Sequence, residues 1–321
     1  MKTIYLCEDT ITVQRVFGTT DMCYKKVDVL NDPKSFRETE YIFSTWGMPQ
    51  LTKEDIKNYL PNLKAVFYAA GSVQGFARPF LECGVKVFSA WAANAVPVAE
   101  YTVAQIILAN KGFYQSSRIA KMGDWVGAHN FCRSISGNYG AKVGIIGAGM
   151  IGKRVINMLK SYNLDVLVFD PFLPEKQAIE IGVKKCPLEV IFQECRVVSN
   201  HLANNKQTRH MLNGELFQKM LPYATFLNTG RGAQVVESDL IDVLKNRPDL
   251  TAVLDVTFPE PPEQNSEFYT LPNCILTPHI AGSIGDEVIR MGEYMKTEYE
   301  NFIQKKPCQY EVTLEMLRTM A

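Results

Sequence analysis

The stretch KVGIIGAGMIGKRV, residues 142–155, decides the fold expected for this 321-residue chain. An apolar run leads into three glycines, and a helix-compatible segment follows them. In a strand–turn–helix unit of this kind, Gly147 permits the tight turn, Gly149 lets the backbone approach a pyrophosphate, and Gly152 lets the helix pack closely on the strand. Free amides at the start of the helix, with the helix dipole behind them, attract that anion. The stretch therefore predicts a dinucleotide-binding turn.

An acidic residue strengthens this prediction, because a glycine pattern alone is a weak signal. The next predicted strand, residues 164–169, leads directly to Asp170, which lies 18 residues after Gly152. That offset is typical of the carboxylate that binds the ribose of NAD. An acid accepts hydrogen bonds from the 2′-hydroxyl and repels a 2′-phosphate, so we expect NAD in preference to NADP.

Composition and length indicate a globular protein of about two domains. Hydrophobic residues make up 46% of the chain, enough for a large core. Lysine and arginine number 34, as do aspartate and glutamate, so no overall basic field attracts nucleic acid or a membrane surface. No apolar stretch is expected to reach the roughly 18 residues that cross a bilayer.

The eight cysteines are scattered without CxxC pairs, and the N-terminal residues do not resemble a secretory signal. These features predict reduced thiols in a cytoplasmic protein. The four histidines are not at ligand spacing with the cysteines, so no metal site is expected.

Short β-rich runs alternate with helical segments along the whole chain, the pattern of parallel α/β sheets. A helix-compatible stretch, residues 98–118, links two such series, and a last helix over residues 283–305 is long enough to return to the first sheet. Strands are expected at residues 3–7, 41–45, 63–69, 85–90, 142–147, 164–170, 196–202, 225–230, 251–256 and 274–280.

This pattern predicts an α/β protein with two Rossmann-like, doubly wound parallel-sheet domains. A flavodoxin-like substrate domain, residues 1–103 and 290–321, surrounds an inserted NAD-binding domain, residues 104–289. Two crossings of the chain between domains are expected to form a hinge over a cleft, where ligands commonly bind.

Open α/β sheets bind ligands beyond the carboxyl ends of their strands, so polar residues at those positions are candidates for chemistry. Arg231 follows the strand in TFLNTGRG, Asp255 and Glu260 follow the strand in TAVLDVTFPEPP, and His279 follows the strand in CILTPHIAGS. Each residue taken alone is more often structural. His129, His210 and Trp125 have no such placement and are predicted to be loop or core residues.

An arginine, an acid and a histidine beside a nicotinamide supply what reduction of a 2-oxo acid requires. A guanidinium grips a carboxylate through two parallel hydrogen bonds and polarises the neighbouring carbonyl. As negative charge grows on the carbonyl oxygen, a protonated imidazole donates its proton. A carboxylate bound to the other ring nitrogen fixes the tautomer and favours the imidazolium.

With these motifs in order, the chain resembles the D-isomer-specific 2-hydroxyacid dehydrogenases over nearly its whole length. The resemblance rests on PNLKAVFYAAGS from Pro61, NAVPVAEYT from Asn94, GIIGAGMIG with Asp170, NTGRG with Arg231, LDV with Asp255, PEP with Glu260, and TPHIAGS with His279. It implies that Arg231 binds the carboxylate and carbonyl of the substrate, that His279 is the general acid/base, and that Glu260 is its carboxylate partner.

The resemblance also implies the cofactor and substrate contacts. Backbone amides near Gly71, Ser72 and Val73 are expected to hold the substrate carboxylate, and the helix from Val98 to contribute to a homodimer interface. Residues expected to bind NAD are Gly147, Gly149, Met150, Ile151, Gly152, Asp170, His201, Thr229, Asp255 and Gly282.

Three positions depart from the family pattern or stay open. His201 is followed by Leu202 and Ala203 where relatives have His-x-Pro, and either a place on the adenine side or a structural role fits it. The loop AAGSVQG lacks the sequence Gly-Val-Asp-Asn. Trp46 and Met48 either cap the substrate pocket or belong to the core.

The sequence therefore predicts an NAD-dependent oxidoreductase that interconverts a small 2-oxo acid and its D-2-hydroxy acid. The alternative is an NAD(H)-responsive binding protein of the corepressor type, since the same fold serves that purpose. Absence of turnover across a panel of 2-oxo acids, together with NADH-dependent binding of a partner, would favour the binding protein over the enzyme.

Overall fold

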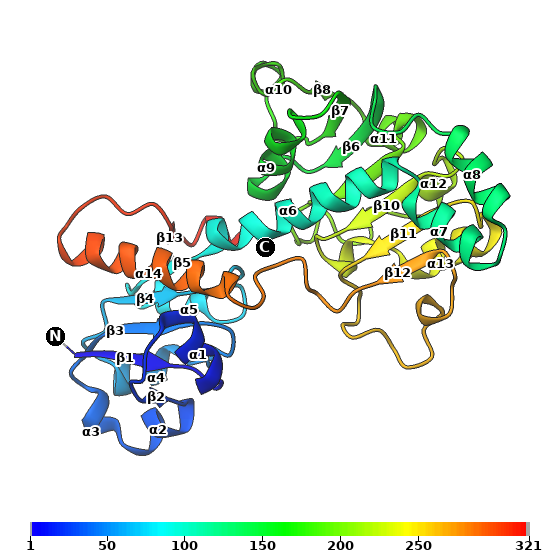
Figure 1. Cartoon of the computed structure of the whole chain (residues 1–321). Coiled ribbons are helices and arrows are strands. Elements are labelled where there is room, and N and C mark those ends of the chain that lie inside the picture. Colours follow the sequence, from blue (N-terminus) through cyan, green and yellow to red (C-terminus); the bar gives the residue numbers. More distant parts are fainter. Residues whose placement is uncertain (1, 319–321) are drawn as a thin grey trace. The chain divides into compact units, whose positions relative to one another are not determined.

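The computed structural model describes residues 2–318, and the chain divides into two compact units (Figure 1). Unit 1 comprises Met1–Ala95 with Ser283–Ala321, and unit 2 comprises Val96–Gly282. The boundaries predicted after residues 103 and 289 lie eight and seven residues further along the chain. They differ because a helical pattern does not show at which residue a helix changes the sheet on which it packs.

Unit 1 contains a six-stranded sheet in the order β13-β5-β4-β3-β1-β2. Its central order, 2-1-3-4-5, is that of the flavodoxin-like fold, as predicted. All neighbouring strands pair in parallel except β13, which is antiparallel to β5. The strands are β1 (Lys2–Leu6), β2 (Cys23–Tyr24), β3 (Thr39–Ser44), β4 (Ala65–Tyr68), β5 (Lys86–Ser89) and β13 (Glu311–Val312).

Helices cover both faces of this sheet because alternate strand residues point to opposite sides. Val66 packs in a core cluster with residues of α4 and α5, whereas Phe67 packs in a second cluster with residues of α1 and α14. The helix α14 is the predicted return to the first sheet. The helices of this unit are α1 (Thr10–Phe17), α2 (Lys26–Asn31), α3 (Pro33–Phe36), α4 (Lys53–Tyr59), α5 (Ala77–Glu82) and α14 (Glu287–Ile303), with a 3-10 turn, η3 (Met316–Arg318).

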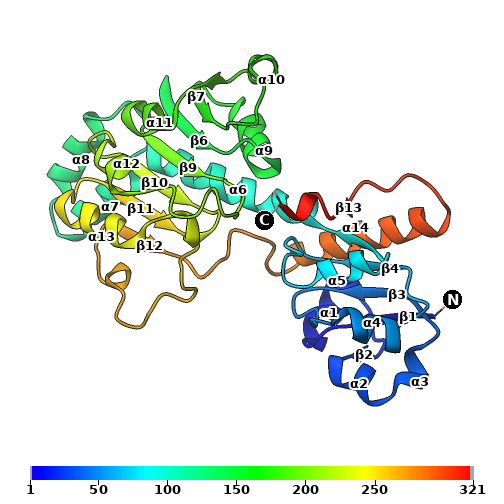
Figure 2. The same cartoon turned by 180° about the vertical axis from the view of Figure 1, so that it is seen from behind.

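Unit 2 contains a seven-stranded parallel sheet in the order β12-β11-β10-β9-β6-β7-β8, seen from behind in Figure 2. Read from β6, this is the doubly wound order 3-2-1-4-5-6 with one further strand. The order reverses between β6 and β9, the switch point at which such sheets bind dinucleotides. The strands are β6 (Ala141–Ile146), β7 (Leu164–Phe169), β8 (Lys184–Lys185), β9 (Val197–Asn200), β10 (Thr225–Asn228), β11 (Thr251–Leu254) and β12 (Cys274–Leu276).

Two apolar layers enclose this sheet. Ile145 packs with Val155 of α9 and residues of α6, and Ile146 packs on the other face with residues of α11, α12 and α13. The fold class predicted from the sequence is thus confirmed in both units. The helices are α6 (Trp91–Asn110), α7 (Phe113–Lys121), α8 (Trp125–Arg133), α9 (Met150–Leu159), α10 (Glu175–Ile181), α11 (Leu188–Glu194), α12 (Gly214–Gln218) and α13 (Glu237–Asn246), with 3-10 turns η1 (Gly232–Gln234) and η2 (Glu267–Tyr269).

The helix predicted over residues 98–118 differs from the structure. The helix α6 begins earlier, at Trp91, and contains Pro97, and Gly112 separates it from α7 with a left-handed φ of 66°. By length and composition alone α6 is long and apolar enough to cross a membrane, although no such stretch was expected from the sequence. However, 56% of that window is buried inside the protein, as in a core helix, so this is weak evidence for a membrane span.

Candidate active site

The glycine turn after β6 has the geometry of an anion cradle. Gly147 has a left-handed φ of 93°, and a Cβ on it would lie 2.7 Å from the carbonyl oxygen of His201. A Cβ on Gly152 would lie 2.0 Å from the carbonyl oxygen of Gly147, so helix and strand pack as closely as predicted. At Gly149, by contrast, nothing lies within 4 Å of the missing Cβ. That open space fits a pyrophosphate against the backbone.

The helix α9 starts directly at this open space. Gly149 is its N-cap residue, and no side chain caps the helix. Met150 begins α9 with a half-exposed side chain, and Ile151 packs against the core beneath. The backbone amides of the first turn are therefore available to an anion. This agrees with the prediction that Met150 and Ile151 bind the cofactor.

Asp170 follows β7, and its carboxylate accepts hydrogen bonds from two turns, the glycine turn after β6 and the turn after β7. Its Oδ2 accepts the Ala148 N–H at 2.7 Å, and its Oδ1 accepts the N–H groups of Phe172 and Leu173 at 2.7 and 3.1 Å. The acid thus joins the glycine turn to the turn after β7. Because each carboxylate oxygen has two lone pairs, Oδ2 keeps capacity to accept a ribose hydroxyl.

His201 is buried beside the glycine turn. Its Nε2 lies 2.9 Å from Ser199 Oγ, and its Nδ1 is buried. Burial lowers the pKa of His201 to about 4, so the ring is neutral near pH 7. Of the two roles that the sequence left open, these contacts support the structural one. Thr229 is also buried, with its hydroxyl 3.2 Å from the Thr102 hydroxyl of α6.

Glu260 and His279 form the pair that the sequence predicted. His279 Nδ1 lies 2.5 Å from Glu260 Oε1, and both side chains are about two-fifths exposed. The two residues follow β11 and β12, neighbouring parallel strands whose carboxyl ends meet at one edge of the sheet. With Nδ1 bound to the carboxylate, the ring presents Nε2 as its free nitrogen.

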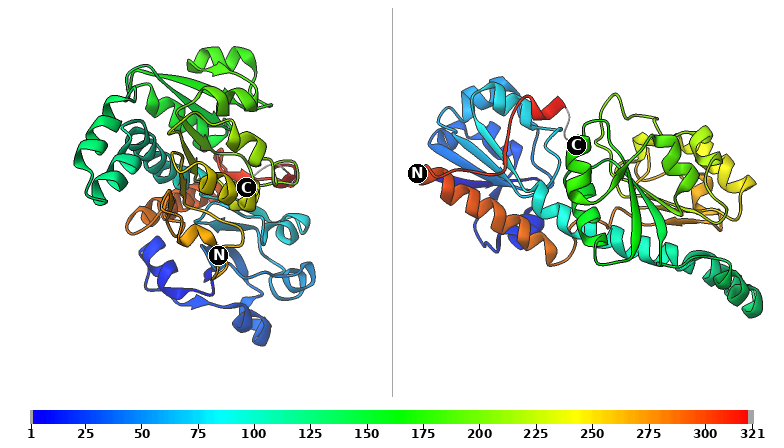
Figure 3. Two further views of the ribbon diagram at one scale, coloured as in Figure 1. Left: turned by 90° about the vertical axis from the view of Figure 1, so that its right-hand side faces the viewer. Right: turned by 90° about the horizontal axis from the view of Figure 1, so that it is seen from above.

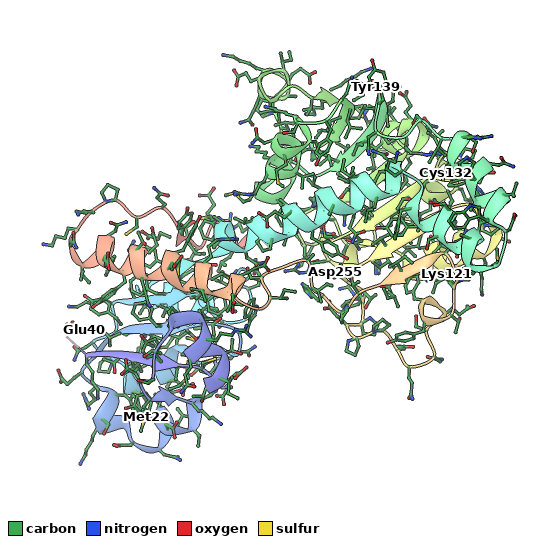
Figure 4. The ribbon with its side chains drawn as sticks, viewed as in Figure 1. Met22, Glu40, Lys121, Cys132, Tyr139 and Asp255 are labelled. Carbon is green, nitrogen blue, oxygen red and sulfur yellow. The ribbon has the colours of Figure 1, made fainter. Side chains whose placement is uncertain are left out.

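Asp255 fixes the segment that carries His279. Its Oδ1 accepts the Ile280 N–H at 2.8 Å and the Thr277 hydroxyl at 2.6 Å, and its Oδ2 accepts the Ala281 N–H at 2.9 Å. The side chain is buried at the carboxyl end of β11, where Figure 4 labels it. Asp255 was predicted to lie beside the nicotinamide, and its positioning of the histidine loop was missed.

The same segment holds His279 in an uncommon conformation. His279 has a φ of 56°, in the left-handed region that few non-glycine residues adopt. Its N–H donates to the Asp255 carbonyl oxygen at 3.0 Å. Backbone strain of this kind is common at active sites, where surrounding contacts hold it in place. Gly282, which follows the segment, is the last residue of unit 2.

Arg231 follows β10, the neighbour of β11, and starts the turn η1. Its Nη1 donates to the Gly230 carbonyl oxygen at 2.7 Å, and its N–H donates to Gln234 Oε1. Burial lowers the pKa of Arg231, and the charge of Glu260 opposes that shift. Arg231, Glu260 and His279 thus come from three consecutive strands of one sheet, with the glutamate electrostatically coupled to both of the others.

The predicted substrate loop lies in unit 1, after β4. Ser89 Oγ donates to the carbonyl oxygens of Ala70 and Gly71 at 2.9 and 2.7 Å, which shapes the start of the loop. The side chain of Val73 is fully buried in the core, whereas Ser72 is exposed. Val73 thus anchors the loop in the core of unit 1, directly after a residue that lies at the surface.

Met48 and Trp46 differ, although the sequence left both between pocket and core. Met48 belongs to the core cluster that includes Val73. Trp46 is 40% exposed, and its carbonyl oxygen accepts the Cys7 thiol. The core interpretation therefore holds for Met48 only.

A family model matches residues 103–281, more than half of the chain, and describes the NAD-binding domain of the D-isomer-specific 2-hydroxyacid dehydrogenases. The chain belongs to this family. The match spans the glycine turn, Asp170 and the histidine segment, so it covers the unit built around the switch point. NAD is the cofactor of this family's domain, and the open cradle at Gly149 fits it.

Relatives of the family align with most of the chain. The D-3-phosphoglycerate dehydrogenase of Archaeoglobus fulgidus is 28% identical over 72% of this chain and 43% of its own length. The glycerate dehydrogenase of Methylorubrum extorquens is 26% identical over 92% of this chain and 98% of its own length. The chain spans about half the length of the first curated relatives it matches.

A solved structure shows the same fold. The D-mandelate dehydrogenase of Rhodotorula graminis superposes with a TM-score of 0.77, covering 97% of each chain at 20% identity. At that identity the likeness concerns the architecture of the family and not the substrate.

Proposed function

We propose that this chain is an NAD-dependent oxidoreductase that interconverts a small 2-oxo acid and its D-2-hydroxy acid. The observation that carries the proposal is the Glu260–His279 hydrogen bond, which lies at the carboxyl edge of an NAD-binding sheet beside Arg231. A histidine bonded to a carboxylate whose charge also acts on a guanidinium matches the charge changes of carbonyl reduction.

His279 is the proton donor of the reduction. When NADH is bound, it supplies the hydride to the carbonyl carbon C2. As charge develops on the carbonyl oxygen, Nε2 of the imidazolium gives that oxygen its proton. The Glu260 carboxylate accepts the hydrogen bond of the Nδ1–H and so stabilises the imidazolium. In the oxidation the neutral ring takes the proton back from the hydroxyl.

Arg231 binds the carboxylate of the substrate and polarises its carbonyl. Its planar guanidinium provides two parallel donors, and its partial burial strengthens each of them. Amides of Gly71, Ser72 and Val73 are proposed to bind the same carboxylate; the exposure of Ser72 and the partial exposure of Gly71 support this role, whereas Val73 is buried.

Turnover with a panel of acids tests the proposal. NADH oxidation is measured with glyoxylate, hydroxypyruvate, pyruvate and longer 2-oxo acids. We expect the rate to rise and saturate with the concentration of at least one of them. Absence of turnover with every acid, together with NADH-dependent binding of a protein partner, would establish the alternative corepressor-type function. Among residues 2–318, which the structure describes, no contact favours that alternative over the enzyme.

Preference for NAD over NADP is proposed to depend on Asp170. Replacing it with serine removes the charge, so we expect the ratio of kcat/KM with NADH to that with NADPH to fall about 10–100-fold, the contribution of a hydrogen bond to a charged group. The matched control is Asp165→Asn, an exposed acid on the same strand, β7, which should leave the ratio unchanged. An unchanged ratio in Asp170→Ser would show that Asp170 does not bind the ribose.

The stretch from Val98 was expected to contribute to a homodimer interface, and its last part is α7. We propose that the homodimer forms through α7 and the following helix α8, which stand outward from the sheet of unit 2 (Figure 3). Met122, Trp125 and Val126 expose large apolar side chains there, with Trp125 76% exposed, so the prediction that Trp125 is a loop or core residue is wrong. Apolar surface gathered in this way is typical of an interface.

Sedimentation measures the proposed assembly. We expect a particle of twice the 36.2 kDa chain mass. Trp125→Glu should yield the monomer, because a carboxylate would be buried without a partner. The control Ile179→Glu changes an equally exposed apolar side chain on α10 and should remain dimeric. A dimeric Trp125→Glu variant would place the interface elsewhere. The cytoplasmic location stays a prediction.

A further inference from the structure

The segments that carry Arg231 and Glu260 are in direct backbone contact. A Cβ on Gly232 would lie 2.0 Å from the carbonyl carbon of Thr257, so only glycine allows the turn η1 to approach this closely. The two segments are therefore packed backbone against backbone. A contact that fixes the Thr257–Glu260 segment also supports the turn that follows Arg231.

Glu237 holds this junction from the start of α13. Its Oε1 accepts the Phe258 N–H at 2.7 Å, two residues before Glu260 along the chain. Within the same short segment, the Thr257 hydroxyl donates to the Pro259 carbonyl oxygen at 2.8 Å. The Phe258 ring lies under the guanidinium of Arg209, 5.2 Å from its carbon to the ring centroid. Two contacts from outside the segment, one to the Phe258 N–H and one to its ring, and one hydrogen bond within it thus fix the residues that lead to Glu260.

Burial disfavours the charged form of the Glu237 side chain. Burial raises the pKa of Glu237 to about 7, and the hydrogen bond from the Phe258 N–H opposes that shift. An acid at the start of a helix ordinarily stays in water, where it stabilises the dipole without losing hydration. Because the Glu237 carboxylate is partly buried, the Phe258 N–H replaces part of the hydration that the carboxylate loses.

We propose that Glu237 is a positioning residue, which fixes the Thr257–Glu260 backbone through the Phe258 N–H and so places the Glu260 carboxylate on His279 Nδ1. The catalytic consequence rests on the function proposed above; the structural consequence does not. Loss of this acceptor lets the segment shift, and a shift of about 1 Å in a supporting group lowers turnover by up to about 100-fold.

Three variants separate positioning from simple stabilisation of α13. Glu237→Leu removes the acceptor, and Glu237→Gln keeps an acceptor oxygen without the charge. Asp239→Leu is the matched control, because Asp239 also lies in the first turn of α13 and accepts a backbone N–H, that of Gly214, at 2.8 Å. The control removes an equivalent bond that does not lead to Glu260.

Two measurements are made on each variant: kcat with the best 2-oxo acid, and the downfield proton NMR signal of the His279 Nδ1–H, assigned by its loss in His279→Asn. We expect Glu237→Leu to lower kcat about 10–100-fold and to weaken or remove the signal, with the KM for NADH within about twofold of wild type. Glu237→Gln and Asp239→Leu should keep kcat within about threefold and retain the signal.

The proposal is overturned if Glu237→Leu keeps wild-type kcat and signal, if Glu237→Gln falls as far as Glu237→Leu, or if Asp239→Leu loses the signal too. If Glu237→Leu does not fold, Glu237→Asp provides the same test, since it is one methylene too short to reach Phe258. If the wild type turns over no 2-oxo acid, the proposed function fails, and the NMR signal alone decides the role of Glu237.

Discussion

Replacement of His279 by asparagine is expected to lower kcat for reduction of the best 2-oxo acid by about 10²–10⁴-fold, the usual contribution of a positioned acid/base. Asparagine tolerates the left-handed backbone that residue 279 adopts, with a φ of 56°, so the loop should keep its shape. Its amide still donates a hydrogen bond toward Glu260, but it has no proton to transfer. Steady-state kinetics with NADH measures the loss.

A second histidine provides the control for backbone effects. His210 is exposed and has a φ of 55°, nearly that of His279. Its N–H donates to the Ala233 carbonyl oxygen, a backbone contact that asparagine keeps, and among the described residues its side chain makes no hydrogen bond or ion pair with Arg231, Glu260 or His279. His210→Asn should therefore keep kcat within about twofold of wild type, since surface substitutions rarely matter. Binding of NADH, followed by fluorescence, should stay unchanged in both variants. Full turnover in His279→Asn would remove the histidine from the mechanism.

The sequence predicts the long, buried strands well because their residues carry the signal themselves. The apolar runs that form β6 and β10 are buried on both faces of the sheet, as near-continuous apolar runs in parallel sheets are. The strands β2, β8 and β13 were missed. Each has two residues at or near a sheet edge, too few to show any periodicity.

The candidate site is predicted in part for a similar reason. Arg231, Glu260 and His279 follow strands, so topology alone brings them to one edge of the sheet. The residues that hold these loops in place could not be predicted in the same way. Asp255 and Glu237 act through backbone N–H groups, at Ile280, Ala281 and Phe258, and no residue type marks an N–H as a partner. Such contacts depend on how loops turn in space, which spacing along the chain does not reveal.

The role of Glu237 illustrates the point. From the sequence it is one of two acids in the first turn of α13, Glu237 and Asp239, and both favour the helix dipole equally. Only the fold distinguishes them, because one acid reaches the segment before Glu260 and the other reaches Gly214. The same contrast makes Asp239 a sharp control.

Replacement of Arg231 by lysine is expected to lower kcat/KM for the 2-oxo acid by about 100-fold while the KM for NADH stays within about twofold. Lysine keeps the positive charge but offers a single point donor, so one of the two hydrogen bonds to a carboxylate is lost, each worth about 1.5–3 kcal/mol when charged. It also loses the guanidinium hydrogen bond to the Gly230 carbonyl oxygen, which fixes the side chain.

Arg196→Lys is the matched control for Arg231→Lys, since Arg196 likewise donates from Nη1 to a backbone carbonyl oxygen, that of Pro222, at 2.7 Å, but precedes β9 at the amino end of the sheet. It should change kcat/KM by less than about threefold, because ligands of such sheets bind beyond the opposite, carboxyl ends of the strands. Kinetics with a 2-oxo acid and with its amide separates the two functions of Arg231. If the guanidinium binds the carboxylate, the acid loses most of its advantage over the amide in Arg231→Lys. An advantage that survives the substitution would assign carboxylate binding to the amides of Gly71, Ser72 and Val73 instead, and would leave Arg231 only the polarisation of the carbonyl.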